Sequence, residues 1–277
     1  MSKHLLQSRI KLVHNVHPRF TRNMATDAKK ELRKSMKTRL SSLNEEQIAE
    51  QSRKAQHIII DLPQYKDANS ISVYLSMPKA EAQTDLIVRD ALKAGKKVFV
   101  PHIHRPPQLD GETKKRSIIE MLRLESAEEY EGLERDSWGI PSLPADGLVS
   151  RENAMGGVGL EETMKTAGGL DLVVVPGVAF DANLMRLGHG AGFYDEYLTR
   201  YCGRNETPKP FLGESDLSCL VFSFLIIVGL RLTSRAVGLC LAEQVLPKGN
   251  KLPTSEHDWR MDAIAVGDGR LVTLEDS

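Results

Sequence analysis

The chain has 277 residues, 41% of them hydrophobic and 27% charged, which is ordinary for a globular protein with a substantial core. The chain has 37 lysines and arginines and 37 aspartates and glutamates. No net charge is therefore present to attract nucleic acid or an anionic membrane, although this balance is compatible with a local basic pocket. The cysteines Cys202, Cys219 and Cys240 are odd in number and lack metal-ligand spacing, so neither a disulfide framework nor a zinc site is expected.

The first 23 residues contain five lysines and arginines and no acid. Such a segment is typical of a mitochondrial transit peptide, and equally of a disordered tail or of sequence ahead of a later start. We expect residues 1–27 to be a flexible or transit-like extension and residues 28–277 to form one domain. The protein is expected in the cytoplasm, with mitochondrial import as the alternative.

Helices and strands alternate along the rest of the chain. An amphipathic helix is predicted over 28–40, and a capping box at residues 42–45 predicts a second helix that ends at Pro63. Further helices are predicted at 85–94 and 193–201, and strands at 70–75, 97–103, 118–124, 171–175, 236–241 and 263–266. This order predicts an α/β fold: an open, mostly parallel sheet with helices on both faces, a Rossmann-like three-layer sandwich.

The segment RLGHGAGFYDEYL (186–198) places three glycines directly before a predicted helix. In open α/β sheets, ligands bind at the carboxyl edge of the strands. Gly188, Gly190 and Gly192 would let consecutive amides face a phosphate, Arg186 would add donors, and Asp195 could hold a magnesium ion. The alternative is a tight loop that only packs closely. The spacing differs from the Walker and dinucleotide patterns, so phosphate binding is a hypothesis here and the nucleotide is not identified.

The residues resemble a known family. VVVPGVAFD (173–181) and RLGHGAGFYDEYL, together with AKKELRKSMKTRL (28–40), ISVYLSMPKAEAQTDLI (71–87), SWGIP (137–141) and WRMDAIAVGD (259–268), are similar to 5-formyltetrahydrofolate cyclo-ligase, also called methenyltetrahydrofolate synthetase. The similarity covers about 28–212 and 236–268 in the right order. It implies a ligase of folate one-carbon metabolism, which uses ATP and Mg²⁺ to convert 5-formyltetrahydrofolate to 5,10-methenyltetrahydrofolate, with release of ADP and phosphate.

The resemblance also implies three sets of site residues. ATP binding falls on two segments of the chain: Lys29, Lys30, Glu31, Leu32 and Arg33, then Arg186, Leu187, Gly188, His189, Gly190, Ala191, Gly192, Phe193 and Tyr194. Substrate binding falls on Leu75, Glu81 and Trp138, with His189, Gly190, Ala191, Gly192 and Phe193. Asp195 and Asp262 match the magnesium carboxylates, expected to meet at the sheet edge. Without the resemblance, we would interpret Lys29 and Arg33 as part of a solvated basic helix face. Leu75 would be interpreted as a core residue and Glu81 as a surface acid.

The glycine loop departs from the family pattern at two positions. His189 and Ala191 stand where RLGRGKGYYD, the usual form, has arginine and lysine. One titratable imidazole therefore replaces two permanent charges, and we expect Lys29, Arg33 and Arg186 to bind more of the phosphate charge. The alternative function is a catalytically weakened homologue that binds folate or nucleotide. A sugar-phosphate isomerase or acyl-carrier transferase on a similar sheet would not require this loop.

Residues 213–235 form an apolar insertion that the family pattern lacks. Its run of 14 uncharged residues, 217–230, is shorter than the about 20 needed to span a bilayer, so a buried segment is favoured over a membrane anchor. The insertion is either translated non-coding sequence or an extra buried helix. The expected partners are the small-molecule substrates alone, with no nucleic acid and no membrane, and the protein is expected to be a monomer.

Overall fold

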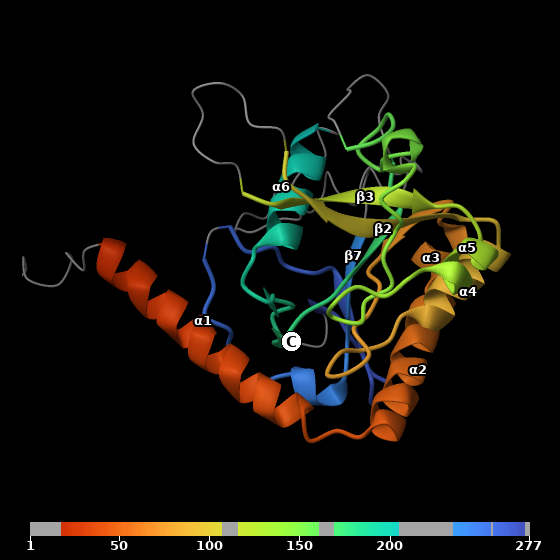
Figure 1. Ribbon diagram of the computed structural model, residues 1–277. Coiled ribbons are helices and arrows are strands. Elements are labelled where there is room, and N and C mark those ends of the chain that lie inside the picture. The colour runs from red at the N-terminus through yellow and green to blue at the C-terminus, as the bar shows by residue number, and fades with distance from the viewer. Residues whose placement is uncertain (1–17, 107–115, 161–168, 205–234, 256, 275–277) are drawn as a thin grey trace, which may run out of the picture.

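The computed structural model describes residues 18–106, 116–160, 169–204, 235–255 and 257–274 (Figure 1). The helices are α1 (Pro18–Leu40), α2 (Glu45–Asp61), α3 (Pro63–Asp67), α4 (Asp85–Lys93), α5 (Ala127–Gly132) and α6 (Phe193–Arg204), with short 3-10 helices η1 (Leu148–Ser150) and η2 (Ala242–Gln244). The strands are β1 (Ser70–Val73), β2 (Lys97–His104), β3 (Ile118–Leu124), β4 (Leu172–Val175), β5 (Ala179–Phe180), β6 (Arg186–Leu187), β7 (Arg235–Cys240), β8 (Ala263–Val266) and β9 (Leu271–Val272).

Seven strands form one sheet in the order β3-β2-β1-β4-β7-β8-β9. The five inner strands run parallel, and β3 and β9 are antiparallel edges. Every residue of β1 and β4 is buried, as expected for strands that are covered on both faces. The predicted open, mostly parallel sheet is therefore confirmed. Strands β5 and β6 form a separate antiparallel pair.

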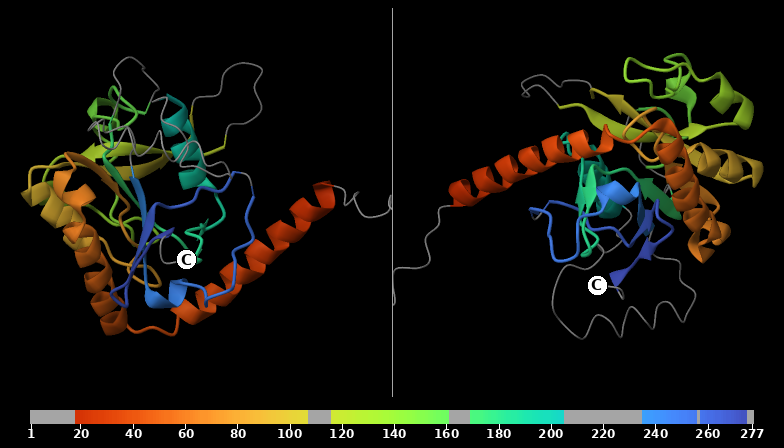
Figure 2. Two further views of the ribbon diagram at one scale, coloured as in Figure 1. Left: turned by 180° about the vertical axis from the view of Figure 1, so that it is seen from behind. Right: turned by 90° about the horizontal axis from the view of Figure 1, so that it is seen from below.

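Helices cover both faces of the sheet, also as predicted (Figures 1 and 2). On one face, α2 and α4 bury Ile59 and Ile87 in a core shared with β1. On the other face, α6 buries Tyr197 and Leu198 against β4 and β8. Helix α1 contributes Leu40, its last residue, to the first of these cores, and its Met36 packs against the β5–β6 pair. This packing brings the first helix to the segment that leads into the glycine loop.

The structure differs from the sequence expectations at two helix starts. Helix α1 begins at Pro18, so residues 18–27, expected as an extension, continue the helix, whose first turns project from the body in Figure 1. The capping box of α2 uses Asn44 and Gln47 rather than residues 42–45. Asn44 caps as well as serine does and has a glutamine three residues later, whereas the Ser42 hydroxyl donates to the Arg39 carbonyl at the end of α1.

No helix within the described ranges is both long enough and apolar enough to cross a bilayer. The apolar run 217–230 lies outside those ranges, as does the insertion up to residue 234. The prediction of a buried segment there remains a prediction.

Gly238 of β7 provides a test of the packing between the sheet and the β5–β6 pair. A Cβ atom at this position would lie 2.6 Å from a ring carbon of Phe180, which is fully buried. We expect Gly238→Ala to lower the free energy of unfolding by about 1–3 kcal/mol, because the ring has no space to move into. Chemical denaturation measures this difference.

Gly132→Ala is the control, because a Cβ atom there meets nothing within 4 Å. Alanine at this helical position should leave stability unchanged or raise it by up to about 1 kcal/mol. Equal effects of the two substitutions would contradict the packing described for Gly238.

Candidate active site

The glycine loop, residues 188–192, joins β6 to α6. Gly190 and Gly192 have φ angles of 107° and 76°, a left-handed conformation that disfavours side chains. Within the part of the chain that the structure describes, the amides of His189, Gly190, Ala191 and Gly192 donate to no acceptor. Four free amides beside the first turn of a helix form a concavity suited to an anion.

A buried ion pair lies beside this loop. Arg186 donates from Nη2 to Oδ2 of Asp195 at 2.8 Å and from Nη1 to the carbonyl of Pro176 at 3.2 Å. Only 3% of the Arg186 side chain and 20% of the Asp195 side chain are exposed. The second Asp195 oxygen, Oδ1, accepts from the amide of Trp259 at 3.1 Å. The cation and the first acid of α6 are thus held together at the carboxyl end of β4.

Helix α1 contributes two cations, as predicted. Arg33 donates from Nε to the Gly188 carbonyl at 2.8 Å, and its guanidinium carbon lies 3.4 Å from where a Cβ of Gly190 would be. Lys29, one turn earlier, pairs with Asp258 at 2.6 Å, both side chains being less than one-fifth exposed. Burial lowers the pKa of Arg33, partly offset by the charge of Asp258.

The other three predicted residues of α1 make no polar contact with the glycine loop in the described parts of the chain. Lys30 and Glu31 are exposed, and Leu32 packs against the small core formed by Met36 and the β5–β6 pair. The resemblance assigned the whole segment to ATP, but the fold brings only the face with Lys29 and Arg33 to the loop.

His189 is the one titratable side chain of the glycine loop. Desolvation lowers the pKa of His189 below its usual value, and the charges of Arg186 and Arg33 lower it further. Both effects favour the neutral imidazole in the absence of a bound anion. A phosphate placed beside it would act in the opposite direction and favour the protonated form.

Glu81 is a buried acid without a cation. It is 6% exposed, and its Oε2 accepts from the amide of Met77 at 2.8 Å. Among the described residues no basic side chain pairs with it, and burial raises its pKa to about 7. Tyr194 lies near it and is partly buried, and its buried hydroxyl has no partner in the described parts of the chain. Unsatisfied polar groups of this kind are typical of ligand sites.

Leu75 and Trp138 occupy different environments. Leu75 is 6% exposed and belongs to the core formed with α2 and α4. Trp138 is 72% exposed, in a turn organised by the Asp136 carboxylate. The next residue, Gly139, packs against Pro78, because a Cβ there would lie 3.0 Å from the proline ring. The tryptophan is thus on the surface, beside the turn that leads to Glu81.

The structure does not bring Asp262 and Asp195 together. Asp262 precedes β8 and accepts from the amide of Ala236, the second residue of β7, at 2.7 Å. It therefore lies at the amino edge of the parallel strands, where burial raises its pKa. Asp195 lies at the carboxyl edge through its pairing with Arg186. The described residues contain no group of three or more His, Cys, Asp or Glu side chains able to hold a metal.

Two residues that contact the candidate site do not appear among the sequence predictions. Asp258 pairs with Lys29, and Arg116 donates from Nη2 to the carbonyl of Ala191. Asp258 directly precedes the segment WRMDAIAVGD, so its place in the sequence was a usable signal. Arg116 precedes β3 in a polar stretch, and nothing in the sequence ties it to the glycine loop.

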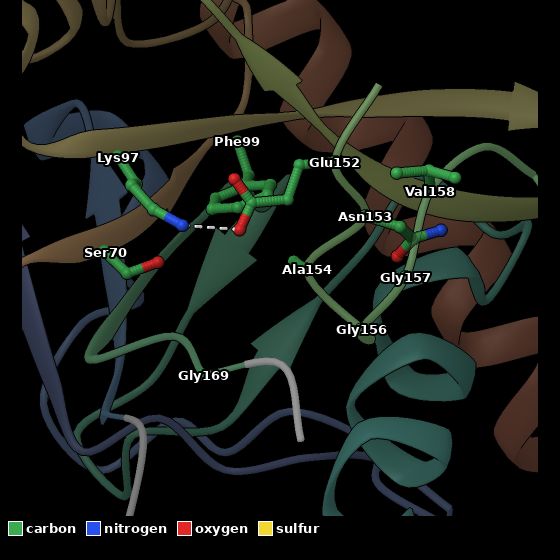
Figure 3. A pocket seen from close by; sticks show the side chains of 10 residues that line it. All are labelled: Ser70, Lys97, Phe99, Glu152, Asn153, Ala154, Gly156, Gly157, Val158 and Gly169. Carbon is green, nitrogen blue, oxygen red and sulfur yellow. Dashed lines mark hydrogen bonds and ion pairs between the residues drawn. The ribbon is translucent and has the colours of Figure 1, made fainter. Parts of the chain in front are cut away.

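A separate hollow of about 420 Å³ lies at the amino edge of the sheet (Figure 3). Ser70, Lys97, Phe99 and Glu152 line it, and the Lys97–Glu152 ion pair at 2.6 Å crosses it. None of the predicted site residues lines this hollow, so we do not assign the site to it.

The buried acid Glu81 makes stability depend on pH. Its pKa of about 7 in the folded protein lies above the ordinary 4.5, so folding is favoured while the acid stays protonated. This contribution is complete below about pH 4.5 and is lost as pH rises through 7. We expect Glu81→Gln to match the wild type near pH 4.5 and to be more stable by about 3 kcal/mol at pH 8.

Urea denaturation at both pH values measures this difference. Glu50→Gln, on the exposed face of α2, is the control and should show no gain in stability at pH 8. A constant difference between Glu81→Gln and wild type across this range would show that Glu81 titrates normally.

Comparison with known proteins identifies the family. The model of the 5-formyltetrahydrofolate cyclo-ligase family matches residues 25–213, ending where the apolar insertion begins. The 5-formyltetrahydrofolate cyclo-ligase of Mus musculus is 32% identical over 241 residues, which cover 87% of this chain and 94% of that protein. A relative from Arabidopsis thaliana, named 5-formyltetrahydrofolate cyclo-ligase, mitochondrial, is 28% identical over 180 residues, 62% of this chain and 56% of that protein.

A solved structure has the same fold. The NMR structure of 5,10-methenyltetrahydrofolate synthetase from Aquifex aeolicus superposes with a TM-score of 0.53 at 23% identity, covering 90% of this chain and 94% of that one. The extent of the family match and the identity to the mouse protein confirm the resemblance found in the sequence. This chain belongs to the 5-formyltetrahydrofolate cyclo-ligase family.

Proposed function

We propose that the protein converts 5-formyltetrahydrofolate to 5,10-methenyltetrahydrofolate, with ATP as co-substrate and Mg²⁺ as cofactor, and with release of ADP and phosphate. The observation that carries this proposal is the set of four free amides of the glycine loop, with Arg33, Lys29 and Arg186 around it. Cations and oriented amides together are what a triphosphate requires.

The chemistry explains why ATP is needed. A formamide carbonyl is a poor electrophile, and its oxygen leaves badly. Transfer of the γ-phosphoryl group to the formyl oxygen breaks the bond to ADP and forms an activated imidate-like phosphate. The second folate nitrogen then attacks the formyl carbon, loses its proton, and the first nitrogen expels phosphate as the ring closes. Such a transfer depends mainly on positioning and on neutralisation of charge.

The ATP site comprises Lys29, Arg33 and the loop from Arg186 to Tyr194 in this proposal. The ion pairs of Lys29 and Arg186 hold both cations in place before the nucleotide binds. Asp195 is the proposed protein ligand of Mg²⁺, since this ion is usually bound by one or two carboxylates plus phosphate oxygens. The ion would neutralise phosphate charge. Asp262, at the opposite edge of the sheet, is not proposed as a ligand.

The folate site comprises Glu81, Leu75 and Trp138 in this proposal. A buried carboxyl beside a free tyrosine hydroxyl is able to hydrogen-bond the N–H groups of a reduced pterin. Leu75 supplies an apolar wall, and the exposed ring of Trp138 is available to stack on the folate.

One assay tests the function. Purified protein with 5-formyltetrahydrofolate, ATP and Mg²⁺ should form the methenyl product, followed by its absorbance, and omission of ATP should abolish product formation. Binding of both substrates without product would contradict the enzymatic proposal. That outcome would select the alternative of a catalytically weakened homologue, motivated by His189 and Ala191.

His189 should couple nucleotide binding to pH. Its neutral imidazole gains a proton when phosphate binds nearby, so lower pH favours binding. We expect the ratio of wild-type ADP affinity to that of His189→Gln to rise by roughly three- to tenfold from pH 8 to pH 6. The ratio removes the titration of ADP itself. It is measured by isothermal titration calorimetry.

His189→Arg is the matched control for this coupling. Because arginine is charged at both pH values, this variant should bind ADP more tightly than wild type at pH 8 and at pH 6, and its side chain should take up no proton on binding. A wild-type ratio that stays constant with pH would show that His189 does not approach the phosphates.

We infer that the protein acts as a monomer in the cytoplasm, with mitochondria as the alternative supported by the basic, acid-free first 23 residues. Fluorescent fusions of the full chain and of a chain that starts at Met24 distinguish the two locations. Light scattering on the purified protein tests the monomer.

A further inference from the structure

Arg116 reaches the glycine loop from a part of the fold that no site assignment includes. It lies two residues before β3, and its guanidinium donates to the carbonyl of Ala191. The side chain is exposed, so core packing does not force it into this contact. The contact instead places a permanent positive charge beside the carbonyl group of Ala191.

Strand β3 is held firmly against the helix that follows the loop. Arg200 of α6 pairs with Glu120 of β3 at 2.7 Å and donates to the Ile119 carbonyl at 2.7 Å. Glu120 is 1% exposed, so this attachment is buried. The start of β3 is therefore fixed relative to α6, which delivers Arg116 to the loop from a defined direction.

Two arginines from distant elements hold the loop by its carbonyl groups. Arg33 of α1 binds the carbonyl of Gly188, and Arg116 binds the carbonyl of Ala191. A peptide group is planar, with its N–H pointing opposite to its C=O. The amides of His189 and Gly192, which follow these carbonyls, therefore point away from the arginines. Both belong to the four free amides of the loop.

We propose that Arg116 is a positioning residue for nucleotide binding, which orients the glycine-loop amides toward the phosphates through the Ala191 carbonyl. This inference rests on the proposed function, since it takes the loop to be the nucleotide site. In this chain the loop has alanine at 191 and no permanent positive side chain between Gly188 and Gly192. Arg116 places a permanent charge on the carbonyl side of the loop, where it holds the peptide group.

The experiment compares Arg116→Ala with Arg105→Ala. Arg105 is an exposed arginine directly after β2, on the opposite arm of the same hairpin, so both variants lose one charge. We expect Arg116→Ala to raise the Kd for ADP with Mg²⁺, and the KM for ATP, about tenfold. The KM for the folate substrate and the thermal midpoint should not change. Arg105→Ala should leave all four quantities unchanged.

Arg116→Lys is the conservative variant. It keeps the charge and one donor, so it should recover ADP affinity to within about threefold of wild type. Equal ADP affinity in Arg116→Ala and Arg105→Ala would overturn the inference. It would also be overturned if Arg116→Ala lowered the thermal midpoint so far that partial unfolding explained the whole loss of ADP binding. Failure of the wild type itself to bind ADP would instead contradict the proposed function.

Discussion

The buried ion pair between Arg186 and Asp195 is the constraint on which the candidate site depends. An arginine with 3% of its side chain exposed requires a partner, because an unpaired charge at this depth would destabilise the fold by several kcal/mol. The pair closes the glycine loop by linking the strand before it to the helix after it. The same aspartate also accepts from the amide of Trp259, so the C-terminal segment is attached at this point.

Positive charge gathers around the loop from every side. Lys29 and Arg33 come from α1, Arg186 from β6, and Arg116 from the start of β3, whereas the acids bound to them are Asp195 and Asp258. Among the described residues, these four cations and two acids leave an excess of positive charge around the four amides that have no acceptor. An anion with several negative charges would pair with the cations and accept from the amides, and a triphosphate is such an anion.

The proposed folate side of the site has a different chemistry. Glu81 is a carboxyl group that burial keeps partly protonated near pH 7, placed near the hydroxyl of Tyr194, which has no partner among the described residues. Because Tyr194 directly follows Phe193 at the start of α6, the acid and the glycine loop are joined through one helix turn. The proposed phosphate-binding region and the proposed folate-binding region thus lie side by side, as transfer of a phosphoryl group between two bound substrates requires.

The sequence by itself determined the sheet, the helices on its faces and the position of the glycine loop, because these follow from local patterns of apolar residues and glycines. The family resemblance assigned Lys29, Arg33 and Arg186 to ATP binding, which stays a prediction; in the structure Arg33 binds the loop, Arg186 pairs with Asp195, and Lys29 pairs with Asp258. Tertiary structure alone decided that Asp258 pairs with Lys29, that Asp262 lies at the opposite edge of the sheet, and that Arg116, two residues before β3, binds the loop. Those contacts join segments that are distant in the chain, and no local pattern encodes which edge of a sheet a side chain will reach.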